Sequence, residues 1–242
     1  MGVRLDMKTE RPQLLARLVG VFFLLTIIGA IIAQGFISDT LVDYSSAAAT
    51  AKNLLENRGL FQAGFTIFLL EMACQLVATA LIYRLLRPVD RTLALVMLLF
   101  ELMAIVIKMS ARVFFIVPLW VLEHGSALGG MSTDQLQSLA LVLLRINDVG
   151  AAAAVAFFGF SNLPMGYLTY RSTFLPRWLG VLGIIAGIGW LAFVYPPLGR
   201  PLAMYIAVFA LLASAAKIFW LIVFGIDEEK FRAVEAASSG TV

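Results

Sequence analysis

Ionisable and amide side chains interrupt stretches of this sequence that are otherwise strongly apolar. Glu71 and Gln75 lie one helical turn apart in one stretch, while Lys108 and Arg112 follow Glu101 on the same helical face in the next. A charged side chain at the bilayer centre costs about 2.5–3.5 kcal/mol, so such residues normally face the bundle interior and mark functional sites. The candidates for a ligand or proton site are Glu71, Gln75, Glu101, Lys108, Arg145, Asn147, Asp148, Ser214 and Lys217.

The embedded acids indicate two kinds of chemistry. Glu71, Glu101 and Asp148 are the candidates for catalysis, because a carboxyl group that burial keeps protonated can donate or relay a proton. The alternative is that these acids pair with embedded bases and lock the helices together. The bases equal the acids in number, and they are Lys108, Arg145 and Lys217.

Depth along the helices restricts which of these groups can pair. Lys108 lies in the outer half of its segment, at the level of Arg145 and Asp148. The sequence therefore predicts that Asp148 pairs with Lys108 or Arg145. It also predicts that one of the two central glutamates, Glu71 or Glu101, pairs with Lys217.

Continuous apolar segments must position these residues. The chain has 242 residues, of which 61% are hydrophobic and 14% charged, whereas globular domains are about 45–50% apolar and about 25% charged. The apolar runs are continuous rather than alternating, which excludes a β-barrel. A helical span needs about 20 apolar residues. Six segments qualify, and they are residues 14–36, 59–83, 91–112, 137–160, 177–195 and 201–226.

The fold class predicted is therefore all-α, a polytopic bundle of six transmembrane helices. Residues 1–13 form an N-terminal segment, residues 14–226 the membrane domain, and residues 227–242 a short polar tail that we expect to be frayed. The third segment can continue to Leu122, with a kink or an end at Pro118, and the fourth towards Tyr170. Residues 38–58 read as a short surface helix, and a Ser-Thr-Asp sequence at residues 132–134 predicts the start of the fourth span.

Lysines and arginines are distributed unevenly between the two ends of the spans. Eleven lie near one set of ends and three near the other. The positive-inside rule then places both termini in the cytoplasm. The eleven are Arg4, Lys8, Arg11, Arg17, Arg84, Arg87, Arg91, Arg171, Arg177, Lys230 and Arg232, and the three are Lys52, Arg58 and Arg200.

Several other functions lack the residues that they need. His124 is the single histidine, so we expect neither a histidine-based metal site nor any other metal or cofactor. Basic residues interleaved with aromatic ones do not occur outside the apolar segments, which argues against nucleic-acid binding. No metalloprotease, serine-hydrolase or phosphate-loop motif is present.

Four stretches carry a family resemblance. They are LVDYSSAAATAKNLLENRGLFQAGF (41–65), YRLLRPVDRTLAL (83–95), FFGF (157–160) and GYLTYRSTFLPRWLGVLGIIAGIGWL (166–191). Together they resemble the bacterial six-helix membrane family known as domain of unknown function 4386, over residues 12–226. The resemblance implies the same six-helix architecture in a bacterial cytoplasmic membrane, and it carries over no catalytic residues.

Three functions remain open on the sequence alone. The first is binding of a small apolar or amphipathic molecule, or a lipid, through an inward-facing polar cluster. The second is an intramembrane general-acid enzyme that acts on a lipid or isoprenoid. The third is a structural or accessory subunit, with membrane-protein partners or as a homo-oligomer, for which Gly183 and Gly187 offer a close-packing GxxxG face. Whether the protein is an enzyme stays open, and membrane lipids are the partners common to all three.

Overall fold

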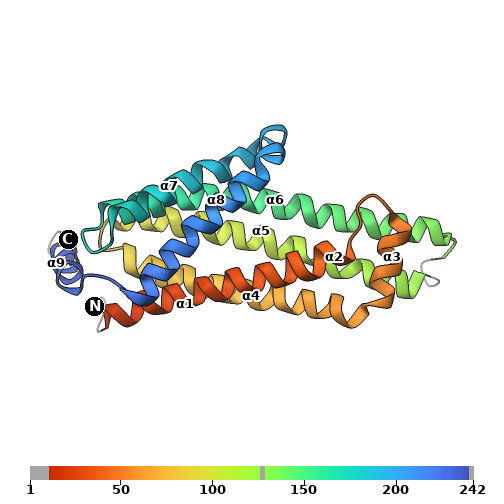
Figure 1. Cartoon of the computed structure of the whole chain (residues 1–242), viewed down its shortest axis with the longest axis horizontal. Helices are drawn as coiled ribbons and strands as arrows, with labels where there is room; N and C mark the ends of the chain where they lie inside the picture. Colours follow the sequence, from red (N-terminus) through yellow and green to blue (C-terminus); the bar gives the residue numbers. More distant parts are fainter. Residues whose placement is uncertain (1–10, 126–128, 240–242) are drawn as a thin grey trace, which may run out of the picture. The chain divides into compact units, whose positions relative to one another are not determined.

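The computed structural model describes residues 11–125 and 129–239, and these residues form helices joined by turns, with no strand among them. Arg4 and Lys8, and most of the predicted N-terminal segment, lie outside the described residues. Figure 1 shows the helices, and in chain order they are α1 (Pro12–Ala30), the π-helix η1 (Ile31–Ser38), α2 (Asp39–Leu41), α3 (Ala47–Glu56), α4 (Arg58–Leu86), α5 (Arg91–His124), α6 (Thr133–Arg171), α7 (Arg177–Leu191), the 3-10 helix η3 (Ala192–Val194), α8 (Pro196–Val223) and α9 (Glu228–Ser239).

Six helical stretches within the described residues are long and apolar enough to cross a membrane. This confirms the predicted all-α fold with six spans. The helices continue beyond the most apolar windows, since α5 runs through Pro118 and α6 runs through Pro164. The stretches are Pro12–Leu41, Arg58–Leu86, Arg91–His124, Thr133–Arg171, Arg177–Val194 and Pro196–Val223.

The chain divides into two compact units, each with its own core. The first unit holds the chain up to Phe23, the stretch Val77–Glu101 and the chain from Phe158 onward. The second unit holds Leu24–Leu76 and Leu102–Phe157. The helices α1, α4, α5 and α6 contribute to both units, whereas α7, α8 and α9 belong to the first.

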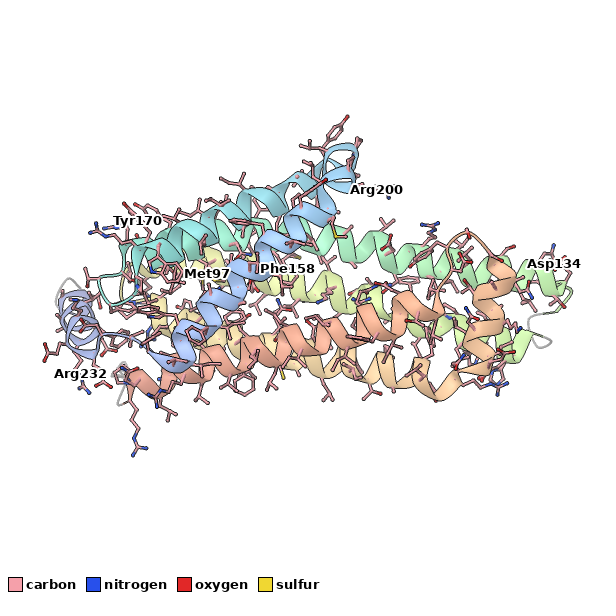
Figure 2. All side chains as sticks on the ribbon, in the orientation of Figure 1. Met97, Asp134, Phe158, Tyr170, Arg200 and Arg232 are labelled. Atoms are coloured by element: carbon pink, nitrogen blue, oxygen red, sulfur yellow. The ribbon has the colours of Figure 1, made fainter. Side chains whose placement is uncertain are left out.

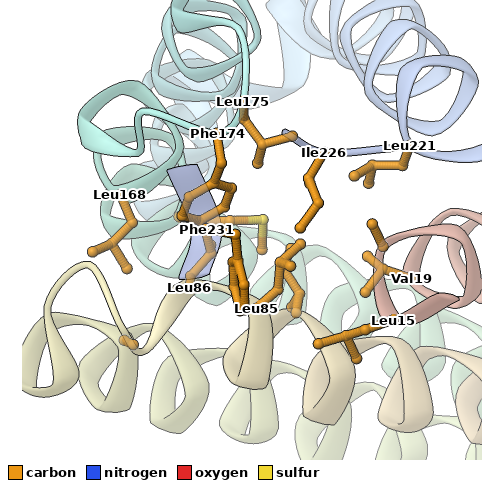
Figure 3. Packing of buried hydrophobic residues seen from close by; sticks show 14 of the residues in the cluster. Leu15, Val19, Leu85, Leu86, Leu168, Phe174, Leu175, Leu221, Ile226 and Phe231 are labelled. Carbon is orange, nitrogen blue, oxygen red and sulfur yellow. The ribbon is translucent and has the colours of Figure 1, made fainter. Parts of the chain in front are cut away.

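The described part of the tail forms α9 and packs into the first unit's core, where a frayed end was expected. Phe231 of α9 is fully buried, and its ring meets the edge of Phe174 at a centroid distance of 5.1 Å (Figure 3). Gln13 of α1 fixes the chain just before α9, because its Nε2 donates to the Ile226 carbonyl at 2.7 Å and its Oε1 accepts from the Ile226 N–H at 3.2 Å. The apolar side chain at position 231 therefore outweighs the polar composition of the tail.

Glycines bring α6 and α7 into backbone contact within the first unit. A Cβ atom at Gly180 would lie 2.5 Å from the Tyr170 backbone nitrogen and 2.6 Å from the Gly166 carbonyl oxygen. Figure 2 shows Tyr170 near the end of α6, beside α7. The GxxxG residues Gly183 and Gly187 face the same helix, so this face packs within the chain.

In the second unit, the segments that join the spans follow the local signals of the sequence. Residues 38–58 contain the expected short helix, α3, and the Ser46 hydroxyl caps it by accepting from the Ala49 N–H at 3.2 Å. The start of α6 has a reciprocal cap, in which Gln135 N–H donates to Ser132 Oγ at 3.3 Å and Ser132 N–H donates to Gln135 Oε1 at 2.8 Å.

Candidate functional site

A largely buried ion pair joins α4 and α5 in the second unit. Lys108 Nζ lies 3.0 Å from Glu71 Oε1 and 3.1 Å from Glu71 Oε2. The Glu71 side chain is 1% exposed and that of Lys108 is 16% exposed. Asp148 was predicted to pair with Lys108 or Arg145, but Lys108 pairs with Glu71 instead, and no ion pair of Asp148 with either base occurs in residues 11–125 and 129–239. The reason lies in the antiparallel packing, because Glu71 lies 15 residues before the end of α4 and Lys108 lies 17 residues after the start of α5, which brings them to nearly the same level.

Arg112 lies one turn beyond Lys108 on α5 and is 3% exposed. Its guanidinium stacks on Phe68, with Cζ 3.5 Å from the ring centroid, and its Nη1 donates to Asn147 Oδ1 of α6 at 3.1 Å. Its Nε is buried without a hydrogen-bond partner among the described residues. The direct contacts of the Arg112 guanidinium are therefore an aromatic face and a neutral amide, while the Glu71 carboxylate acts on its charge without a direct hydrogen bond.

The sequence placed Arg112 on the correct face but left it outside the candidate set. The predicted span ended at residue 112, where an arginine reads as an interface anchor. In the structure α5 continues to His124, which puts Arg112 well inside the helix. Phe68, one helical turn before Glu71, supplies the aromatic face of this contact.

Two other candidate residues, Arg145 and Asp148, lie beside the group formed by Glu71, Lys108, Arg112 and Asn147 and not within it; we call this position the rim. Arg145 and Asp148 are both exposed. They sit about 200° and about 100° around α6 from the buried Asn147, at about 100° per residue, so they cannot share its inward direction. Arg145 instead stacks on Tyr44, with Cζ 4.1 Å from the ring centroid, and its Nη2 donates to the Tyr44 carbonyl at 3.1 Å.

Tyr44 provides a spectroscopic reporter of this rim. Burial and, to a lesser degree, the Asp148 carboxylate raise the pKa of the Tyr44 hydroxyl from its ordinary value of 10.0 to about 12, against the opposing charge of Arg145. The pKa of this hydroxyl is higher in the folded protein than in the unfolded chain, so its protonated form favours folding. This contribution to the free energy of unfolding is complete below pH 10.0 and is lost as the pH rises to about 12. The phenolate absorbance of wild type minus that of Tyr44→Phe should therefore appear near pH 12 in the folded protein. A difference centred at pH 10.0 would contradict this environment.

Small residues allow the helices to approach the cluster closely. A Cβ atom at Gly29 of α1 would lie 3.0 Å from the Cβ atom of Glu71. A Cβ atom at Gly150 of α6 would lie 2.7 Å from the Cβ atom of Ala111, next to Arg112. These contacts hold α1 against α4 and α6 against α5, and they leave little freedom for the charged side chains between them.

The first unit contains a second, smaller polar group. Lys217 of α8 donates to Met165 Sδ at 3.3 Å and lies 4.7 Å from the ring centroid of Phe23. Glu101 of α5 is 3% exposed and interacts electrostatically with Lys217. The predicted pairing of Lys217 with one of the central glutamates stays a prediction, since this interaction is one of charge and does not by itself establish an ion pair. Ser214 is half-buried one turn before Lys217.

The candidate residues thus fall into separate groups. We define the outer cluster as Glu71, Lys108, Arg112 and Asn147, all of the second unit. Gln75 is buried on α4, one turn from Glu71 in the same unit. Across residues 11–125 and 129–239, no group of three or more His, Cys, Asp or Glu side chains is placed to hold a metal ion.

Apolar helices of spanning length, with charged and amide side chains inside them, define a multi-pass helical membrane protein. The chain belongs to the family described as Domain of unknown function (DUF4386), whose model matches residues 18–225. It is also similar to an uncharacterized protein of Archaeoglobus fulgidus, with 28% identity over 166 residues, which is 66% of this chain and 81% of that protein. No solved structure is significantly similar to it.

Proposed function

We propose that the outer cluster binds the polar head of an amphipathic small molecule or lipid, while the apolar part of that molecule lies along the membrane-facing helices. The observation that carries this proposal is the ion pair of Glu71 and Lys108, one turn from a buried Arg112. Intramembrane charged groups of this kind are costly and are typical of substrate and ion sites. The exposed apolar side chains of α4 and α5, Leu70 and Val106 among them, offer a surface for the tail.

The arrangement of Glu71 favours binding over general-acid chemistry. Both of its carboxylate oxygens accept hydrogen bonds from Lys108, so neither is oriented to donate a proton to a substrate. A purely structural role is less favoured because a lock needs matched charges, and Arg112 adds a cation beyond the pair. We therefore place ligand binding ahead of catalysis and of a structural subunit.

Photo-crosslinking tests this proposal. Two photoreactive lipids, one with a zwitterionic head and one with an anionic head, would be activated in nanodiscs and the adducts mapped by peptide mass spectrometry. We expect adducts from at least one probe on the α4, α5 and α6 peptides that hold the outer cluster. The variant Arg112→Gln/Asn147→Leu should lose them, whereas the matched variant Arg58→Gln/Asn57→Leu, at exposed positions, should keep them. The proposal would be contradicted if the adducts of both probes were spread over the whole chain and if Arg112→Gln/Asn147→Leu gave the same adducts as wild type.

We also propose that both termini face the cytoplasm of a bacterial cell and that the outer cluster lies towards the opposite side. Eleven lysines and arginines against three support this orientation. In a Cys74→Ala background, an impermeant maleimide added to intact cells should label Ser45→Cys at once. It should label Ser238→Cys only after lysis. The reverse pattern would invert the orientation.

A further inference from the structure

We infer that the head bound at the outer cluster is an oxyanion, a phosphate or a carboxylate. This inference rests on the proposed function and narrows it to a class of ligand. Three observations support it, which are the charge of the inward-facing groups, the free edge of one guanidinium and the depth of the cluster in the membrane.

The outer cluster has one more cation than it has anions. Lys108 and Arg112 share the single carboxylate of the cluster, that of Glu71. Asp148 is exposed, and it interacts electrostatically with Arg112 without forming an ion pair with it in the part of the chain that the structure describes. Because buried charges are screened less than exposed ones, the positive excess acts on whatever enters the cluster.

A further two acids near the rim do not remove this excess. Asp39 is exposed and accepts a hydrogen bond from Gln34 Nε2 at 2.7 Å. Asp43 is exposed as well and accepts from the N–H and hydroxyl of Ser45 at 2.9 and 2.6 Å. Both carboxylates are therefore engaged by neighbouring residues at the surface, where solvent screens their charge.

The Arg112 guanidinium is arranged to bind two oxygens of one group. Its face is covered by Phe68 and its Nη1 is used by Asn147. The remaining edge includes the Nε–H, which is buried and has no partner in residues 11–125 and 129–239. Arginine binds carboxylate and phosphate through two parallel N–H groups on one edge, which makes this edge a ready donor pair.

The depth of the cluster fits an anionic head at a membrane surface. At about 1.5 Å per residue, the rise along α5 from Arg91 to Arg112 is about 31 Å, and the rise along α6 from Asn147 to Arg171 is about 36 Å. The hydrocarbon core of a bilayer is about 30 Å thick. Counted from the arginines at positions 91 and 171 as one interface, the outer cluster lies at the boundary between the hydrocarbon core and the head groups of the other leaflet, with Lys108 on the hydrocarbon side. A lipid phosphate resides at that level with its tails directed into the bilayer.

Native mass spectrometry of the purified full-length chain tests this inference with two probes of the same tails, phosphatidylglycerol, which carries a phosphate, and diacylglycerol, which carries no oxyanion. Wild type should bind phosphatidylglycerol about tenfold more tightly than diacylglycerol, as expected for a hydrogen bond to a charged group. Arg112→Gln should remove the preference, and Arg112→Lys should retain part of it because it keeps the charge without the two-donor edge. The matched control Arg58→Gln, at an exposed position on α4, should keep the full preference.

The outcomes distinguish a free anion from a lipid head group, and they distinguish a failure of this inference from a failure of the proposed function. Competition by inorganic phosphate would indicate that the free ion is bound, and its absence would indicate that the lipid tails are needed; both outcomes support an oxyanion site. Equal binding of the two lipids by wild type would overturn the inference, while adducts of the zwitterionic probe at the cluster would leave the proposed function standing. A preference that persists in Arg112→Gln would also overturn it. The comparison of lipids on wild type remains decisive even where a variant fails to fold.

Discussion

Replacing Glu71 with Gln should lower the free energy of unfolding by about 3 kcal/mol or more, because removal of one partner leaves buried charge uncompensated. Lys108 and Arg112 would both lose their shared counter-charge. The midpoint of thermal unfolding should then fall by roughly 6–12 °C in a fixed detergent. Lys108→Gln should cost less, since Arg112 remains to compensate Glu71.

The double variant Glu71→Gln/Lys108→Gln is the critical comparison. It should be more stable than Glu71→Gln alone, because the second change removes one of the two unpaired cations. Glu123→Gln serves as the matched control, since its partner Arg58 is 58% exposed and the two approach to 3.2 Å at the surface. Such pairs contribute about 0–1 kcal/mol. A Glu71→Gln variant as stable as Glu123→Gln would show that the buried pair does not hold the cluster.

Replacing Gly180 with Leu should be similarly damaging through packing. A side chain at this position meets backbone atoms of α6 at 2.5–2.7 Å, and backbone cannot rotate aside as a flexible side chain can. Overpacking typically costs about 1–3 kcal/mol and occasionally more, and here α7 would have to separate from α6. Gly180→Ala should already lower the midpoint of thermal unfolding measurably.

Gly59→Ala provides the control for this prediction. Apart from its chain neighbours and the backbone of its own helix, nothing lies within 4 Å of a Cβ at Gly59, which is also helical. Alanine in a helix is favoured over glycine by about 0.5–1 kcal/mol, so this variant should be neutral or slightly more stable. Equal midpoints for Gly180→Leu and Gly59→Ala would contradict the close packing of α6 and α7.

The six spans were predictable because apolar length alone determines them. The same signal could not place the tail, since the burial of Phe231 depends on tertiary contacts with Phe174 that composition does not report. Apolar length also could not predict where the helices end, because α5 continues through Pro118 to His124. Local capping was predictable, and the Ser-Thr-Asp sequence before α6 marked its start at Thr133.

The sequence predicted which residues belong to the candidate site better than it predicted which of them pair with one another. Glu71, Lys108 and Asn147 were identified by the cost of placing polar groups in a bilayer. Their pairing was not, because it depends on which faces of α4 and α5 the antiparallel packing turns toward one another. The exposure of Asp148 and the inclusion of Arg112 both follow from the rotation of α5 and α6 about their axes, which depends on the packing of Gly150 against Ala111.

The most direct test of the account is whether a molecule accompanies the protein through purification. Native mass spectrometry of wild type, released from gentle detergent, should detect a bound amphipathic molecule near one per chain. Arg112→Gln should lose that molecule while Arg58→Gln retains it. A stable wild-type protein that carries nothing, and that binds no added lipid at the outer cluster, would contradict a ligand-binding role and favour a structural one.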